Sequence, residues 1–326
     1  MRILFLRAAY HNFWEALGIG YLSAYAKQEF GNDVDIDFVD AAFDTEYVIR
    51  KKILQNDLLA ISCTTPTFVE GLKWAKEAKI LNKNIHVCMG GWHPTVGKYD
   101  DFEKNKELDT WIAGEGEKPF NNLIRNFPSE HRTAIYSRDV ETFDNLPWPD
   151  RELVFVERNL SLCKGMSGLR IASFQSRRGC QNRCTICGEC KMSHNNLRIR
   201  DPEDVLDEIE SVDKNYKIDV FQFVDPTWAY PPNAAFKFCE SKIKRGNKLP
   251  WYAMAHAAYL NKDLLKIMKE SNCDQINIGV ESGSQKILNE MKKGVTVDKI
   301  KKVFKWCHEV GLKTRAFFII GLPSES

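Results

Sequence analysis

Short apolar runs rich in β-branched residues alternate with helical patterns along residues 1–128. An amphipathic helix repeats its apolar positions about every 3.6 residues, whereas a buried parallel strand is a short continuous apolar run. The helical repeat is plain in Gly18–Glu29 and Phe68–Leu81. The intervening runs predict five strands: Ile3–Leu6, Val34–Val39, Leu58–Ser62, His86–Met89 and Thr110–Ala113. This alternation predicts an α/β fold, with a doubly wound, Rossmann-like domain over residues 1–128.

Proline recurs after this region, at Pro128, Pro147 and Pro149. Proline has no backbone N–H to donate and disfavours a helix at the residue before it. Residues 129–168 are therefore predicted to be an irregular linker.

The alternation resumes over residues 169–326 and predicts a second α/β domain. A helix should start at Asp201-Pro202, which supply a side-chain cap and a proline in the first turn. Five more strands are predicted: Leu169–Ser176, Val220–Val224, Trp251–Ala255, Gln275–Val280 and Thr314–Ile320. The chain stops soon after the last run, where another helix would begin, so we expect the C-terminus to be truncated.

Composition narrows the class of protein. The net charge is +2 with 28% charged residues among 326, so there is no basic surplus to suggest nucleic-acid binding. The chain has no run of about 18 apolar residues that would predict a membrane span, and the apolar stretch Met1–Leu6 is too short for a signal peptide. Ten cysteines without a secretion signal indicate reduced thiols and metal binding in a cytoplasmic protein.

Three of these cysteines are closely spaced: Cys180, Cys184 and Cys187. Thiolates at such spacing suit zinc or an iron–sulfur cluster. Structural zinc usually takes four ligands in two separated pairs. Three ligands to a four-iron cluster would leave one iron open for chemistry. The alternative is a zinc site completed by Cys190 or His194.

This Cys-x3-Cys-x2-Cys pattern after a strand resembles the radical S-adenosylmethionine superfamily. In that family three cysteines hold a 4Fe-4S cluster, and the open iron binds the amino and carboxylate groups of S-adenosylmethionine. An electron from the cluster then cleaves that molecule to methionine and a 5′-deoxyadenosyl radical. The resemblance implies a partial (β/α)6 TIM-type barrel. Ile186 stands where the family usually has an aromatic residue, and it is predicted to lie against the cofactor.

Later motifs in the same order extend the resemblance. Asp225, after the second strand of this region, matches the position that binds the amino group of S-adenosylmethionine. Glu281 and Ser282 match the ribose motif, and Gly321 lies in the segment that contacts adenine. Asp225 could instead be a turn residue, and Glu281 could cap the next helix. His256 is a candidate substrate contact.

The strand ends of the first domain resemble the cobalamin-binding domain found ahead of many radical S-adenosylmethionine enzymes. They carry glycines and hydroxyls, which admit close backbone approach and offer donors. The predicted cobalamin contacts are Ser62, Thr64, Gly90, Gly91, His93, Gly114 and Glu115. The Asp-x-His-x-x-Gly motif that ligates cobalt elsewhere is absent, as it usually is in the related radical enzymes. His93 could also be an ordinary turn residue.

The resemblance therefore implies an enzyme that uses a 4Fe-4S cluster, S-adenosylmethionine and cobalamin to methylate an unactivated carbon. The same architecture could catalyse oxidative cyclisation or rearrangement without methyl transfer. A non-catalytic iron–sulfur or corrinoid-binding protein is the alternative from another class. A small-molecule or peptide substrate and an electron donor such as flavodoxin or ferredoxin are expected partners. No individual catalytic residue is identified.

Overall fold

The computed structural model describes residues 1–9, 14–128, 131–137, 141–322 and 325. The chain divides into two compact units. The first unit comprises Met1–Asn159 and Lys191–His194, and the second comprises Leu160–Cys190 and Asn195–Ser326. The predicted domain limits at 128 and 168 stay a prediction.

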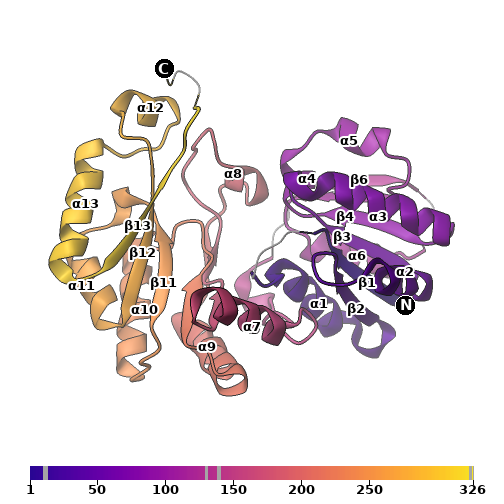
Figure 1. The fold of residues 1–326 in the computed structure, drawn as a ribbon, viewed down its shortest axis with the longest axis horizontal. Helices are drawn as coiled ribbons and strands as arrows, with labels where there is room; N and C mark the ends of the chain where they lie inside the picture. The colour runs from indigo at the N-terminus through magenta and orange to yellow at the C-terminus, as the bar shows by residue number, and fades with distance from the viewer. Residues whose placement is uncertain (10–13, 129–130, 138–140, 323–324, 326) are drawn as a thin grey trace. The chain divides into compact units, whose positions relative to one another are not determined.

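The first unit is built on a six-stranded parallel sheet in the order β2-β1-β3-β4-β5-β6. Its strands are β1 Arg2–Arg7, β2 Asp35–Asp40, β3 Leu58–Ser62, β4 His86–Gly90, β5 Thr110–Ala113 and β6 Thr133–Tyr136. Its helices are α1 Leu17–Phe30, α2 Glu46–Gln55, α3 Phe68–Leu81, α4 Trp92–Val96, α5 Tyr99–Lys104 and α6 Glu117–Arg125. The α/β fold with parallel sheets is confirmed (Figure 1).

Alternate side chains of each strand enter two separate cores, as a doubly wound sheet requires. Leu4 and Leu6 of β1 pack with residues of α2 and α3, including Trp74. Ile3 and Phe5 pack on the opposite face with residues of α1 and α6. Both faces of the sheet are thus covered by helices.

The segment predicted to be an irregular linker contains a strand and an α-helix. The short strand β6 adds to the edge of the sheet beside β5. The helix α7, Val156–Ser167, runs from the end of the first unit into the second. Sequence patterning missed β6 because its four residues are all partly or fully exposed, so no apolar run marks it.

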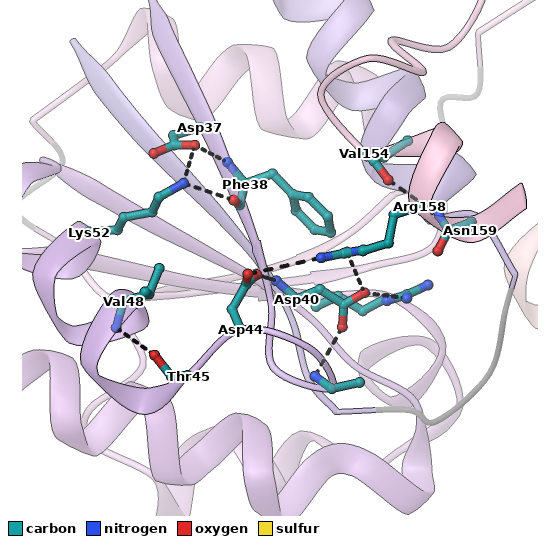
Figure 2. Close-up of polar contacts among 12 residues, drawn as sticks. Asp37, Phe38, Asp40, Asp44, Thr45, Val48, Lys52, Val154, Arg158 and Asn159 are labelled. Carbon is teal, nitrogen blue, oxygen red and sulfur yellow. Dashed lines mark hydrogen bonds and ion pairs between the residues drawn. The ribbon is translucent and has the colours of Figure 1, made fainter. Parts of the chain in front are cut away.

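A buried charge cluster holds the start of α7 to the first sheet. Asp40, the last residue of β2, is fully buried and accepts hydrogen bonds from the guanidinium groups of Arg7 and Arg158. Figure 2 shows Arg158 reaching Asp40 from α7. The same guanidinium lies 4.6 Å from the Phe43 ring and 4.8 Å from the Phe155 ring. Because an unpaired buried carboxylate is costly, this pairing fastens the first turn of α7.

The second unit contains a five-stranded parallel sheet in the order β13-β12-β11-β10-β7. Its strands are β7 Ile171–Phe174, β10 Val220–Phe223, β11 Trp251–Ala255, β12 Cys273–Glu281 and β13 Lys313–Phe318. Its helices are α9 Pro202–Tyr216, α10 Pro232–Lys244, α11 Lys262–Glu270, α12 Gln285–Glu290 and α13 Val297–Val310. All five strands predicted for this region are present.

The predicted start of α9 is confirmed, because the Asp201 side chain accepts a hydrogen bond from the Glu203 backbone N–H at 2.8 Å. Helices α10, α11 and α13 cover one face of the second sheet (Figure 1). That face is apolar, and Phe223 and Trp251 pack there against Phe238 of α10. The sheet with its helices is half of a barrel wall.

Candidate functional site: a cysteine loop and two strand edges

The three cysteines lie in a loop that leaves the second sheet after β7. Its base is an antiparallel pair of short strands, β8 Arg177–Arg178 and β9 Arg198–Ile199. Cys180 and Cys184 are half-buried and Cys187 is exposed, and all three are free thiols. The Cys187 N–H donates to the Cys184 carbonyl at 3.1 Å, which closes a turn between two of the thiols.

The donor set of this loop fits an iron–sulfur cluster. Burial raises the pKa of the Cys180 and Cys184 thiols, and the Lys293 cation acts in the opposite direction on Cys184. The Glu189 N–H lies 3.5 Å from the Cys187 sulfur, as a donor to a thiolate would. Within the described ranges, no three His, Cys, Asp or Glu side chains converge closely enough to hold a metal ion. Cluster binding would therefore draw the three thiols together.

The two residues that could complete a zinc site are engaged elsewhere. The His194 Nε2 bonds to the Ser137 carbonyl at 2.9 Å, and both residues belong to the first unit. The Cys190 thiol donates to the Cys187 carbonyl at 3.5 Å. Neither side chain stands as a fourth ligand beside the three thiols.

Asp225 clamps the base of the cysteine loop. It is fully buried after β10, and its Oδ1 accepts the backbone N–H groups of Ser176 at 2.9 Å and Arg177 at 3.1 Å. Its Oδ2 accepts the Ser176 hydroxyl and lies 3.7 Å from the Arg177 Nε. Burial lowers the pKa of the Arg177 guanidinium to about 10, which leaves it cationic at neutral pH. Asp225 has no exposed surface in this arrangement, and the contact with S-adenosylmethionine stays a prediction.

Two further contacts hold the loop over the carboxyl ends of β11 and β12. The Tyr259 hydroxyl donates to the Asn182 Oδ1 at 2.6 Å. The Thr185 N–H donates to the Met291 carbonyl at 3.0 Å. The loop that begins at one edge of the sheet thereby reaches the strands in its middle.

Glu281, the predicted ribose contact, ends β12 with a left-handed backbone, φ 63°. Its carboxylate does not cap α12 but pairs with the Lys293 ammonium at 2.8 Å. Lys293 is buried, and its carbonyl accepts the His256 Nε2–H at 2.7 Å. The His256 Nδ1 accepts the Ala258 N–H, so His256 supports the backbone here. Burial lowers the pKa of His256 to about 4, so its ring is neutral.

Sequence reasoning missed Lys293. It lies twelve residues beyond Glu281, between α12 and α13, and no strand end marks it. Its ammonium nevertheless acts electrostatically on both Glu281 and Cys184. A buried cation that pairs with a carboxylate and favours the charged form of a thiol suits a site that handles negative charge.

Gly279 makes room for the Glu281–Lys293 pair, and Gly279→Ala should disrupt it. A Cβ at Gly279 would lie 2.5 Å from the Glu281 Oε1 and 2.9 Å from the Lys293 Nζ. We expect the free energy of unfolding to fall by about 1 to 3 kcal/mol, as for other overpacked sites. The matched control is Gly283→Ala, because nothing lies within 4 Å of a Cβ there. Equal urea midpoints for the two variants would contradict the prediction.

The other predicted S-adenosylmethionine contacts lie on separate segments of the second unit. Ser282 is buried directly after Glu281, and its Oγ accepts the Ser284 N–H at 3.2 Å. Gly321 follows β13, where its N–H and that of Leu322 donate to the Glu325 carboxylate. Ile186 is 41% exposed within the cysteine loop, so it is free to contact a ligand.

In the first unit, the predicted cobalamin residues gather at the carboxyl ends of three adjacent strands. Ser62 and Gly90 are register partners on β3 and β4. Thr64 follows β3, Gly91 follows β4, and Gly114 and Glu115 follow β5. A Cβ at Gly91, where φ is +102°, would lie 2.8 Å from the Cys63 carbonyl, so this turn requires glycine.

Thr95, which sequence reasoning did not select, joins two of these loops. Its hydroxyl oxygen lies 2.8 Å from the Gly91 carbonyl and accepts the Gly114 N–H at 2.9 Å. The loops after β4 and β5 therefore form one connected edge. Thr95 lies only two residues beyond the predicted contact His93, but its role depends on Gly114, nineteen residues away.

His93 is packed into the first unit. It is buried, and its ring stacks on Phe68 with the centroids 3.8 Å apart. Its Nδ1 lies 3.2 Å from the Thr65 hydroxyl. Burial lowers its pKa, against the pull of Asp101. The structure gives His93 a packing role, and contact with cobalamin stays a prediction.

Comparison with protein-family models finds two matches in this chain. The Radical SAM superfamily model matches residues 175–326. The B12 binding domain model matches residues 3–124. The first range begins just before the cysteine loop, and the second covers the strand edge that holds Gly91 and Thr95.

Curated relatives match nearly the whole chain. An anaerobic magnesium-protoporphyrin IX monomethyl ester cyclase of Rubrivivax gelatinosus is 26% identical over 100% of this chain. The uncharacterized methyltransferase PH0819 of Pyrococcus horikoshii is 25% identical over 95% of it. The chain spans 63% of the cyclase and 70% of the second relative.

A solved structure has the same fold. The radical S-adenosylmethionine methyltransferase TsrM from Kitasatospora setae superposes with a TM-score of 0.79 at 15% identity, over 100% of this chain and 68% of that protein.

Among the helices in the described ranges, none is both long and apolar enough to cross a membrane.

Proposed function

Because the chain belongs to the radical SAM superfamily and carries a B12 binding domain ahead of that domain, we propose that it is a cobalamin-dependent radical S-adenosylmethionine enzyme that methylates an unactivated carbon. The observation that carries the proposal is the cysteine loop itself. It carries three free thiols, and the Lys293 ammonium that pairs with Glu281 acts electrostatically on one of them, Cys184, in a chain that has both domains.

Cys180, Cys184 and Cys187 would hold the cluster, which supplies the electron that cleaves S-adenosylmethionine. Asp225 would keep the base of this loop in place through Ser176 and Arg177. Lys293 would hold Glu281 in position for the ribose hydroxyls and lower the cost of negative charge at Cys184.

In the first unit, the edge formed by Ser62, Thr64, Gly91 and Gly114 would receive cobalamin. Glycine backbones and hydroxyls let a flat ligand approach closely and offer it hydrogen-bond donors. The ends of parallel strands are where ligands bind in doubly wound domains.

Oxidative cyclisation is the second candidate reaction. The observation that favours it is the relative named as a cyclase, which aligns with all of this chain. Either reaction needs a reductant and a substrate, and we propose flavodoxin or ferredoxin as the electron donor. All ten cysteines are free thiols, which suits the reducing cytoplasm.

A direct test is to reconstitute the protein anaerobically with iron, sulfide and cobalamin, and then to add S-adenosylmethionine and dithionite. We expect about four irons per chain, about one retained cobalt, and both S-adenosylhomocysteine and 5′-deoxyadenosine as products. S-adenosylhomocysteine forms only when the methyl group leaves, so it reports methyl transfer.

The product pattern separates the candidates. 5′-Deoxyadenosine alone, with cobalt retained, would overturn methyl transfer and leave radical chemistry without it, the class to which cyclisation belongs. Neither product from a fully loaded protein would overturn both. The Cys184→Ser protein is the matched background control.

A further inference from the structure

The second sheet carries a polar face opposite its helices. Register places one residue from each strand in a single row across it. The members of this polar row are Ser173, Gln222, Tyr252, Gln275 and Lys313. The next row toward the carboxyl ends contains Met254, Asn277 and Arg315.

Strand alternation decides which way these side chains point. Along β12, Ile276 and Ile278 alternate with Gln275, Asn277 and Gly279, and both isoleucines are fully buried. Their register partners Ala253 and Ala255 lie on the same face of β11 as Trp251, which packs against Phe238 of the helix α10. The two polar rows therefore face away from the helices, toward the interior of the half-barrel.

The interior of a closed eight-stranded barrel is filled mainly by branched apolar side chains. Here amides, a tyrosine and cations take those places. Gln222 donates to the Ser173 hydroxyl at 3.2 Å, and Gln275 donates to the Asn277 Oδ1 at 2.8 Å. Lys313 pairs with Asp274 at 3.1 Å. These contacts satisfy most of the first row.

The second row leaves donors without acceptors. The Asn277 Oδ1 is taken by Gln275, so its amide N–H groups remain free to donate. Its register partner Arg315 is exposed and has no hydrogen-bond or ion-pair partner among the described residues. Met254, on the other side of Asn277, is 36% exposed and apolar. An amide and a guanidinium side by side match the oxygens of an anion.

We propose that Asn277 and Arg315 bind a carboxylate or phosphate group of the substrate, while Met254 contacts its apolar part. The substrate is then an acidic small molecule. Asn277 lies four residues before Glu281 on β12, a distance of about 13 Å along the strand. The anion would anchor one end of a molecule whose other end reaches the cysteine loop. This proposal rests on the proposed function, because it takes this face as the substrate's place.

The test uses the full chain without S-adenosylmethionine, and succinate, inorganic phosphate and the neutral 1,4-butanediol as probes. Binding is measured by ligand-observed NMR titration. We expect both anions, but not the diol, to bind. Arg315→Met should weaken anion binding about tenfold or more, in line with a hydrogen bond to a charged group. Asn277→Leu should weaken it severalfold without any change in charge.

The control is Lys301→Met, which removes the same charge from an exposed position on α13. Equal weakening by Lys301→Met, no effect of Asn277→Leu, or equal binding of the diol would each overturn the proposal. Tighter binding of phosphate would assign a phosphate ester, and tighter binding of succinate a carboxylate. Anion binding with the expected pattern in a protein that cleaves no S-adenosylmethionine would leave this site standing while the proposed reaction fails.

Discussion

Serine at Cys184 should leave the reconstituted protein with almost no bound iron and no formation of 5′-deoxyadenosine. A cluster of this kind is held by thiolates, and a serine hydroxyl stays protonated at neutral pH and binds iron poorly. The same result is expected at Cys180 and Cys187, since three ligands leave none to spare. Iron content and the visible absorption spectrum measure the effect.

Cys190→Ser is the matched control for this prediction. Cys190 lies three residues beyond Cys187, and a serine hydroxyl can keep its bond to the Cys187 carbonyl. This variant should retain its iron. Loss of iron from Cys190→Ser as complete as from Cys184→Ser would indicate a fourth cysteine ligand and contradict a cluster with one open iron.

Asp225→Ala should lower the free energy of unfolding of the second unit by about 3 to 5 kcal/mol, the range for a buried ion pair that loses one partner. The substitution leaves the buried Arg177 guanidinium without its carboxylate and removes the acceptor of the Ser176 and Arg177 N–H groups. Urea unfolding of the anaerobic protein measures the change. Iron uptake should fall as well, because these residues lead directly into the cysteine loop.

Asp263→Ala provides the surface control for Asp225, since its side chain is 83% exposed on α11. Its effect should stay within about 0.5 kcal/mol. The loss of stability in Asp225→Asn should lie between those of Asp225→Ala and Asp263→Ala, because an amide oxygen can still accept the backbone N–H groups but carries no charge. Unchanged stability with weaker S-adenosylmethionine binding would refute the clamp and favour the contact predicted from the sequence.

The placement of the three cysteines in one loop was predictable because their relation is local, and their role as cluster ligands stays a prediction. Cys180, Cys184 and Cys187 are held close by covalent spacing, whatever the rest of the chain does. The same reason explains the success with β3, β5, α3 and the Asp201 cap. Each depends on apolar periodicity or capping chemistry within one short segment.

The partners of the functional side chains were not predictable in this way. From the sequence, Asp225 was predicted to bind a cofactor. In the structure, strand pairing places its carboxylate against the backbone of Ser176 and Arg177, 49 and 48 residues earlier. His93 appeared as a loop residue and is packed on Phe68. The local sequence shows which chemical group a residue carries, but not which distant residue will be its hydrogen-bond or packing partner.

What the sequence by itself determined is therefore the order of strands and helices and the thiol triplet. Only the tertiary structure decided that Lys293 meets Glu281 and that Asn277 lies beside Arg315. The reason is physical. Periodicity and spacing act along the chain, whereas burial, charge pairing and strand register act between segments, and a shift of one residue in register would turn Arg315 to the opposite face.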